Sequence, residues 1–195
     1  MKNKIRNIVL VAFFLLCLLP TPEIRPAFAE IYLLYPTNGE VAGVSSYTPD
    51  TNYYGWVGVF HFDYNEGIAY LKYDLSSIPD HENINSVVLL ASYSSLSQPS
   101  GPVSVDIYYA SDNSWSATTV TWNTRPNLSA FLARSIFDET IQPTVWALSW
   151  YKYKSNLTDN YLSLAMVQPN LAGSGINFRY PFIVITTKTH KPPQP

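Results

Sequence analysis

The feature that most constrains this chain is a two-residue alternation of apolar and polar side chains, repeated in short runs. In the run AYLKYDL (69–75), the odd-numbered residues are all apolar, whereas Lys72 and Asp74 are charged. An extended chain points successive side chains to opposite faces, so each run predicts a half-buried antiparallel strand. Similar runs lie at residues 56–62, 84–93, 103–109, 161–167 and 182–186.

Turn-forming residues separate these runs, at positions 48–50, 65–67, 78–80, 98–101 and 173–175. Roughly eight to ten short strands at this spacing, with no long amphipathic helix, predict an all-β fold. The expected architecture is an antiparallel β-sandwich of the jelly-roll type. Residues 144–153 fit either a strand or a helical turn, and the proline-rich residues 188–195 are predicted to form a tail.

The first 29 residues have the features of a secretory signal peptide. Three basic residues precede an apolar run at 8–19, and Ala27 and Ala29 supply the small side chains that a signal peptidase requires. The apolar run is too short to cross the roughly 30 Å hydrocarbon layer of a membrane. We therefore predict that residues 1–29 are removed on export and that residues 30–187 form one secreted module.

Composition argues against two classes of protein. Loss of residues 1–29 leaves 195 − 29 = 166 residues and removes Cys17, the single cysteine. A secreted domain without a disulfide must be stabilised by its core, unlike small disulfide-rich scaffolds. The remaining chain holds 8 basic and 13 acidic residues, a net charge of −5, and residues 30–120 contain ten of those acids but one lysine. Such a chain is a poor nucleic-acid binder.

Three motifs, in order along the chain, resemble a known family. They are VSSYTPDTNYYG (44–55), YLKYDLSSIPDHENINSVVLLASY (70–93) and VSVDIYYASDNSWSATTVTWNTRP (103–126). Together they resemble the DNRLRE domain, also called the disaggregatase-related repeat and classified as carbohydrate-binding module family 96. Tyr73 takes a position where the family pattern has phenylalanine, and Ala117 takes an acidic position. The resemblance covers about half of the predicted mature chain.

This resemblance implies a jelly roll that occurs in extracellular proteins and binds polysaccharides, acidic ones such as alginate among them. The second half of the chain departs from the family pattern. WALSW (146–150) stands where a W-x-x-x-D-V-T-like segment is typical, and FRYPF (178–182) stands where a serine-glutamate pair is typical. The fold therefore carries over to this half better than any site does.

The two tryptophans of WSATTVTWNTRP (115–126) are either sugar-stacking platforms or core residues. If residues 119–122 form a strand, Val120 and Trp122 share one face and the threonines share the other. A face of valine and tryptophan is typical of a core. We therefore predict that Trp122 lies in the core and that Trp115 packs in a turn.

Sugar-binding aromatic residues are then expected in loops. The densest cluster is Asn52, Tyr53, Tyr54 and Trp56, in a polar loop that also contains a glycine. Aromatic faces can stack on a pyranose ring while an amide group bonds its hydroxyls. The alternative is that these rings only cover one end of the sandwich.

A second candidate site is the run of Tyr151, Lys152, Tyr153 and Lys154, in which aromatic and basic residues alternate. Together with Arg125, these basic groups would pair with carboxylates or sulfates and would favour an acidic glycan. The alternative is a solvated turn with ordinary surface lysines.

Two oxygen-rich turns in the acidic half could hold a calcium ion. The candidate ligands are Asp50, Asn52, Asp63 and Glu66. Calcium prefers about six to eight oxygen ligands of these types. The expectation depends on the two turns meeting in space.

Catalysis has little support in the sequence. His61, His81 and His190 lack the spacing of metal ligands, and no nucleophile motif is present. Paired carboxylates from distant strands could still form a glycosidase site. We predict a non-catalytic polysaccharide-binding module. The alternative is a structural or adhesive cell-envelope protein that acts through tyrosine-rich protein contacts.

Overall fold

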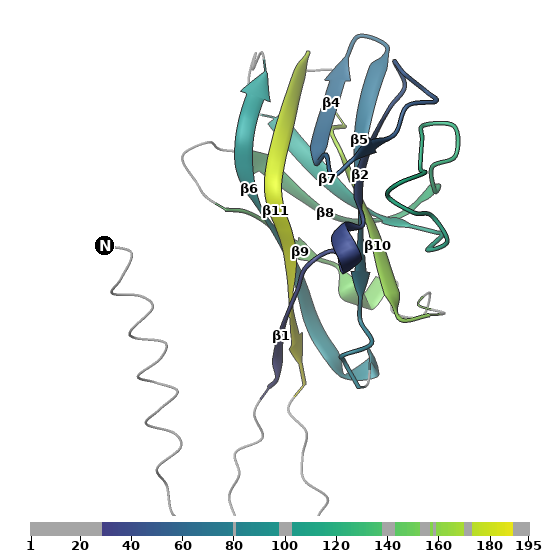
Figure 1. Cartoon of the computed structure of the whole chain (residues 1–195). Helices are drawn as coiled ribbons and strands as arrows, with labels where there is room; N and C mark the ends of the chain where they lie inside the picture. The colour runs from purple at the N-terminus through teal and green to yellow at the C-terminus, as the bar shows by residue number, and fades with distance from the viewer. Residues whose placement is uncertain are drawn as a thin grey trace, which may run out of the picture. The chain divides into compact units, whose positions relative to one another are not determined.

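A computed structural model describes residues 29–79, 81–97, 103–137, 143–152, 157, 159–169 and 173–188. The predicted signal peptide up to residue 28, and residues 189–195 of the predicted tail, lie outside the described residues. Within the described ranges the chain is built from eleven strands and three short 3-10 helices (Figure 1). The strand pairs in these ranges are antiparallel, so the predicted all-β antiparallel class is confirmed.

The strands are β1 (Ile31–Leu34), β2 (Val41–Ser45), β3 (Tyr53–Tyr54), β4 (Gly58–Phe62), β5 (Asn65–Asp74), β6 (Ile84–Ser97), β7 (Val103–Ala110), β8 (Leu128–Phe137), β9 (Thr144–Leu148), β10 (Tyr161–Val167) and β11 (Ser174–Thr187). The short helices are η2 (Thr37–Gly39), η3 (His81–Asn83) and η4 (Trp150–Lys152). The segment beginning at residue 144, left open by the sequence, is thus a strand followed by a helical turn. Across the described ranges, no helix combines the length and the apolar character needed to cross a membrane.

The eight strands from β4 to β11 form two sheets with jelly-roll connections. Hydrogen-bonded neighbours give the orders β4-β11-β6-β9 and β5-β10-β7-β8. Counted along the chain from β4, these orders are 1-8-3-6 and 2-7-4-5, which is the topology of a jelly roll. The β4–β5 hairpin joins the two sheets at one edge, and the Ser149 amide bonds the Leu132 carbonyl at the other. The predicted jelly-roll architecture is confirmed.

The main hydrophobic core fills the space between the two sheets. Ala69, Leu71 and Tyr73 of β5 are fully buried there, as the alternation predicts. Trp146 of β9 is also buried, and its indole N–H donates to the Val105 carbonyl at 2.9 Å. Burial of each large apolar side chain contributes roughly 1.5–3 kcal/mol, so this core stabilises the sandwich.

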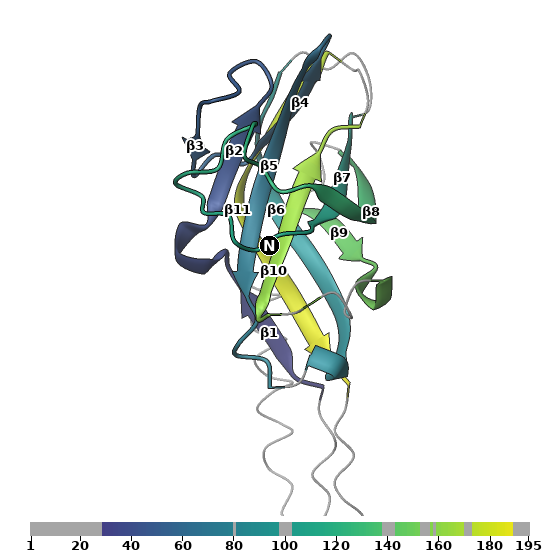
Figure 2. The ribbon, with the colours of Figure 1, turned by 90° about the vertical axis from the view of Figure 1, so that its right-hand side faces the viewer.

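Residues 111–127 form a loop on the opposite face of β5 (Figure 2), and a second hydrophobic core lies beneath this loop. Tyr70, on the face that the alternation assigns to solvent, is fully buried there because this loop crosses it. Trp115 packs edge-on against Tyr70, with ring centroids 5.8 Å apart, and its indole N–H donates to Ser163. Trp115 is therefore buried in a non-strand segment, as predicted.

A buried lysine fixes this loop to β5. The Lys72 ammonium donates to the carbonyls of Trp115 and Asn113 and lies 3.7 Å from the Glu40 carboxylate. Glu40 also accepts a hydrogen bond from the Ala117 amide at 2.7 Å. Because a buried charge is stable only when it is paired, Lys72 and Glu40 together hold the loop in place.

Residues 119–122 do not form the strand on which the prediction for Trp122 was conditional, because the chain turns there between β7 and β8. Trp122 packs against the second core and is only partly buried. The Arg125 guanidinium lies 3.6 Å from the centroid of the Trp122 ring and donates to the Trp122 carbonyl. The stacked cation covers one face of the ring, so Trp122 lies at the rim of this core rather than inside the main one.

Candidate functional site

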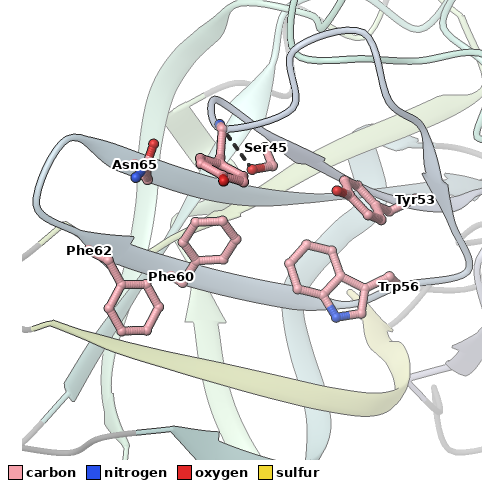
Figure 3. A pocket seen from close by; sticks show the side chains of 7 residues that line it. Ser45, Tyr53, Trp56, Phe60, Phe62 and Asn65 are labelled. Carbon is pink, nitrogen blue, oxygen red and sulfur yellow. Dashed lines mark hydrogen bonds between the residues drawn. The ribbon is translucent and has the colours of Figure 1, made fainter.

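An aromatic groove lies where the β4–β5 hairpin meets β2 and β3 (Figure 3). Its volume is about 480 Å³. Figure 3 shows Trp56, Phe60 and Phe62 in a row along one side, and Tyr53 and Asn65 on the other. None of the described residues that line the groove is charged. The described residues that line this aromatic groove are Ser45, Tyr47, Tyr53, Trp56, Phe60, Phe62 and Asn65.

The segment 56–62 places apolar side chains on both of its faces. Val57 and Val59 are buried in the core between the sheets. The even-numbered aromatic residues alternate with these valines and therefore point to the opposite side of the strand, into the groove. A strand of a soluble protein ordinarily carries polar side chains on the face that the core does not cover. An uncovered row of aromatic rings is typical of a binding surface.

Glycines form the floor beneath these rings. A Cβ atom on Gly43 of β2 or on Gly58 of β4 would overlap the ring of Trp56. A Cβ atom on Gly67 of β5 would overlap the ring of Phe60. The two rings therefore rest directly on the backbone of three strands, and their other sides line the groove.

Neighbouring groups hold the rings in fixed positions. The Trp56 indole N–H donates to the Asn177 Oδ1 at 2.7 Å. Ring centroids are 5.6 Å apart for Tyr53 and Trp56, 6.1 Å for Trp56 and Phe60, and 5.7 Å for Phe60 and Phe62. Because the rings are already ordered by these contacts, little side-chain entropy remains to be lost when a ligand binds.

A sequence model of carbohydrate-binding module family 96 matches residues 42–179. The chain belongs to this family. The matched range contains every residue that lines the aromatic groove, and it includes the second half, where the motifs depart from the family pattern. A comparison with curated proteins found no match.

The groove of this family 96 module contains part of the first predicted cluster. Tyr53 and Trp56 line the groove. Tyr54 lines a different hollow, because successive strand residues point to opposite sides. The Asn52 amide group donates hydrogen bonds of 2.9 and 2.6 Å to two carbonyls of the loop 111–127. Asn52 therefore connects two loops, and its N–H groups are already occupied.

The structure does not place the second predicted cluster at the groove of the family 96 module. Tyr151 is exposed on η4 and lines neither the groove nor the hollow next to Tyr54. Arg125 stacks on a tryptophan of its own loop. Sugar binding by this cluster stays a prediction, since part of it lies outside the described residues: Tyr153, Lys154 and the side chain of Lys152.

The predicted calcium ligands of the family 96 module either have protein partners or are exposed to solvent. Asp50 accepts a hydrogen bond from Asn123, Glu66 lies 3.7 Å from His61, and Asp63 is exposed in the hairpin turn. Within the described part of the chain, no three or more His, Cys, Asp or Glu side chains are grouped to hold a metal ion. The structure gives no support to a calcium site at these residues, and calcium stays a prediction.

Sequence reasoning missed five residues of the groove. Trp56, Phe60 and Phe62 follow one another at even positions, and this spacing could have indicated an aromatic face on the strand. Ser45 on β2 and Tyr47 just after it carry no comparable local signal, because only the pairing of β2 with β5 brings them to the hairpin. The missed residues are Ser45, Tyr47, Phe60, Phe62 and Asn65.

Proposed function

We propose that this family 96 module binds a polysaccharide chain in the aromatic groove without cleaving it. The observation that supports the proposal most strongly is the row formed by Trp56, Phe60 and Phe62 (Figure 3). Each ring offers a pyranose an apolar surface, and removal of that surface from water on binding stabilises the complex. Several rings in one row would bind successive sugar units of a chain.

Polar groups at the sides of the groove would orient the sugar. Ser45 and Asn65 line the groove together with the exposed ring of Tyr47. The Tyr47 hydroxyl and the Asn65 amide can bond sugar hydroxyls, whereas the rings bind the apolar faces. The Ser45 hydroxyl is buried and already accepts a hydrogen bond from the Tyr47 amide. A mostly apolar surface with a few polar groups is typical of small-molecule sites.

The lining of the groove favours binding over hydrolysis. Most glycosidases need two carboxyl groups on either side of the scissile bond, roughly 5–10 Å apart. Among the residues that the structure describes, no aspartate or glutamate lines the groove. We therefore propose a binding role and no cleavage.

The groove would recognise the sugar faces of a glycan whether or not the glycan is acidic. The expectation of an acidic glycan came from the family resemblance and from Arg125, Lys152 and Lys154, and none of the described residues that line the groove is basic. We also propose that the module acts outside the cell, on the strength of the signal-peptide features in residues 1–29.

The experiment compares two tyrosines that are equally exposed, Tyr47 at 75% in the groove and Tyr151 at 74% on η4. The purified protein is tested for retention on neutral and acidic polysaccharides, with calcium and with a chelator. Tyr47→Ala is expected to lower the affinity for the retained polysaccharide by about two- to tenfold, without a change in thermal midpoint. Tyr151→Ala, in the second predicted cluster, is the matched comparison: it should bind like the parent protein if the groove is the site, whereas a loss confined to Tyr151→Ala would reject the groove in favour of that cluster.

Two results would reject the proposal. The first is a folded protein that no polysaccharide retains, which would favour the adhesive role. The second is an equal effect of Tyr47→Ala and Tyr151→Ala, which would place the binding surface elsewhere. A loss of retention in chelator would support the predicted calcium ion.

A further inference from the structure

A second hollow lies on the other side of β3 from the aromatic groove. Its volume is about 460 Å³, and it lies between the start of β2, the β3–β4 loop and β11. Four of its lining side chains are exposed, namely Tyr35, Tyr54, Arg179 and Tyr180. We call this surface the tyrosine–arginine hollow.

Nothing that lines the hollow neutralises the charge of Arg179. Within the described ranges, Arg179 has no ion pair and no side-chain hydrogen bond. None of the described residues that line the hollow is acidic. Glu40, which lies next to the lining residue Val41, is already paired with Lys72 and with the Ala117 amide. The guanidinium is therefore available to an anionic group that enters the hollow.

A β-bulge in β11 turns two successive side chains to this surface. The pairing of β11 with β6 shifts register between Arg179 and Phe182, and Tyr180 has a φ of +53°. A regular strand would point one of two successive side chains inward, but Arg179 and Tyr180 are both exposed. Bulges with such a backbone are enriched next to binding sites, where they redirect side chains.

The backbone of Tyr180 is strained, and burial of its ring does not offset the strain. A left-handed backbone is unfavourable for a residue with a large side chain. Tyr180 is 74% exposed, so packing of its ring supplies little compensation. Strained residues of this kind concentrate at sites where the geometry serves a function.

We propose that the tyrosine–arginine hollow is a second glycan-binding site, which takes a sugar with an anionic substituent, a carboxylate or a sulfate. The planar guanidinium of Arg179 would bond two oxygens of that group. Tyr54 and Tyr180 would pack against the sugar ring. The uncharged aromatic groove recognises sugar faces only, so the two sites differ in what they select. The second site does not depend on binding in the groove.

The test uses pairs of polysaccharides that differ in charge. Polygalacturonate is compared with its fully methyl-esterified form, and dextran sulfate is compared with dextran. The protein is expected to bind the charged member of at least one pair more tightly than the neutral member. This difference should shrink as sodium chloride is raised, because salt screens exposed charges. The pair that shows the difference identifies carboxylate or sulfate as the preferred group.

Two variants test the residues of the hollow. Arg179→Gln is expected to remove the charge-dependent difference, about two- to fivefold, while the affinity for the neutral polymers stays unchanged. Tyr180→Gly removes the ring and relieves the backbone. It is expected to weaken binding of the charged polymer while the thermal midpoint stays equal to that of the parent or rises. A tyrosine with a purely structural role would lower the midpoint instead.

The outcomes separate this site from the groove. Tyr47→Ala should weaken binding to both members of a pair by the same factor, because the groove does not sense charge. If charged and neutral polymers bind equally, or if Arg179→Gln keeps the difference, the second site is rejected and the groove is unaffected. If the difference depends on Arg179 but Tyr47→Ala has no effect, the groove is rejected and the hollow is supported.

Discussion

Two clusters of aromatic rings rest on β-strands of this module, and neither belongs to the core between the sheets. Beneath residues 111–127, Tyr70 and Trp115 are buried. At the β4–β5 hairpin, Trp56 and Phe60 are only half-buried and line an open groove. Both indole N–H groups donate to polar side chains, so hydrogen bonding does not distinguish the clusters. What differs is that a loop covers one cluster, and the comparison teaches that coverage separates a core from a binding surface.

The largest loss of stability is expected when a ring is removed from the covered cluster. Trp115→Ala removes a buried ring that packs against Tyr70, and it should lower the free energy of unfolding by about 3–5 kcal/mol. Urea denaturation measures this loss. Phe62→Ala, in the open groove, should cost much less stability and should instead weaken polysaccharide binding. Similar losses of stability in the two variants would contradict the distinction between the clusters.

A methyl group beneath the open cluster should disturb both stability and binding. In Gly43→Ala, the new Cβ overlaps the Trp56 ring, which has to leave its place in the groove. Overpacking of this kind costs about 1–3 kcal/mol, and we expect polysaccharide binding to be lost as well. Denaturation followed by tryptophan fluorescence, together with a retention assay, measures both effects.

The matched control for that change is Gly175→Ala. The nearest atom to its added Cβ is the Cβ of Phe60, 3.0 Å away, so Phe60 has to shift by a few tenths of an ångström, whereas no atom of Trp56 is among the nearest neighbours. If Gly43→Ala retained full binding, the Trp56 ring would not be part of the sugar-binding surface.

A smaller effect is expected from the two buried tyrosines of β5, which point to different cores. The Tyr70 hydroxyl donates to the Pro126 carbonyl at 2.9 Å, whereas the Tyr73 hydroxyl has no hydrogen-bond partner in the described structure. Tyr73→Phe should therefore stabilise the protein by about 1–2 kcal/mol. Tyr70→Phe should destabilise it by about 1 kcal/mol. Urea denaturation at neutral pH measures both changes, and a loss of stability in Tyr73→Phe would show that its hydroxyl is bonded.

The dependence of stability on alkaline pH provides a second test of Tyr70 and Tyr73. Burial raises the pKa of Tyr70 and of Tyr73 above the ordinary value of 10.0. The folded state therefore favours the neutral phenol over the phenolate. The free energy of unfolding is unaffected by these tyrosines below pH 10.0, and it falls as the pH rises above that value, because the unfolded chain then loses the phenol protons first. Tyr73→Phe should make the loss of stability above that pH shallower. An unchanged alkaline profile would contradict this assignment.

Sequence reasoning predicted the fold well but assigned several single residues wrongly. The alternation in residues 69–75 correctly identified the inner face of β5. It also assigned Tyr70 and Lys72 to solvent, because the alternation carries no information about a loop that arrives from residues 111–127. Trp122 was assigned to the core because its segment was taken as a strand, but the chain there turns instead.

The candidate site was only partly accessible to the same reasoning. Tyr53 and Trp56 stand in a conspicuous cluster and do line the groove. Tyr47 lines it as well, but its place depends on the register between β2 and β5, which the local pattern does not encode. Arg179 was noticed only as a departure from the family pattern, and its exposure in the hollow depends on a bulge in β11.

By itself, the sequence determined the class of structure. The two-residue period of a strand is a local property, so each run predicts a strand without information from the rest of the chain. The spacing of turns along the chain then favoured the jelly roll that the strand order confirms. Only the tertiary structure decided which aromatic surface became a core and which remained open. The physical reason is that coverage depends on contacts between distant segments, such as the bond from Lys72 to the Trp115 carbonyl.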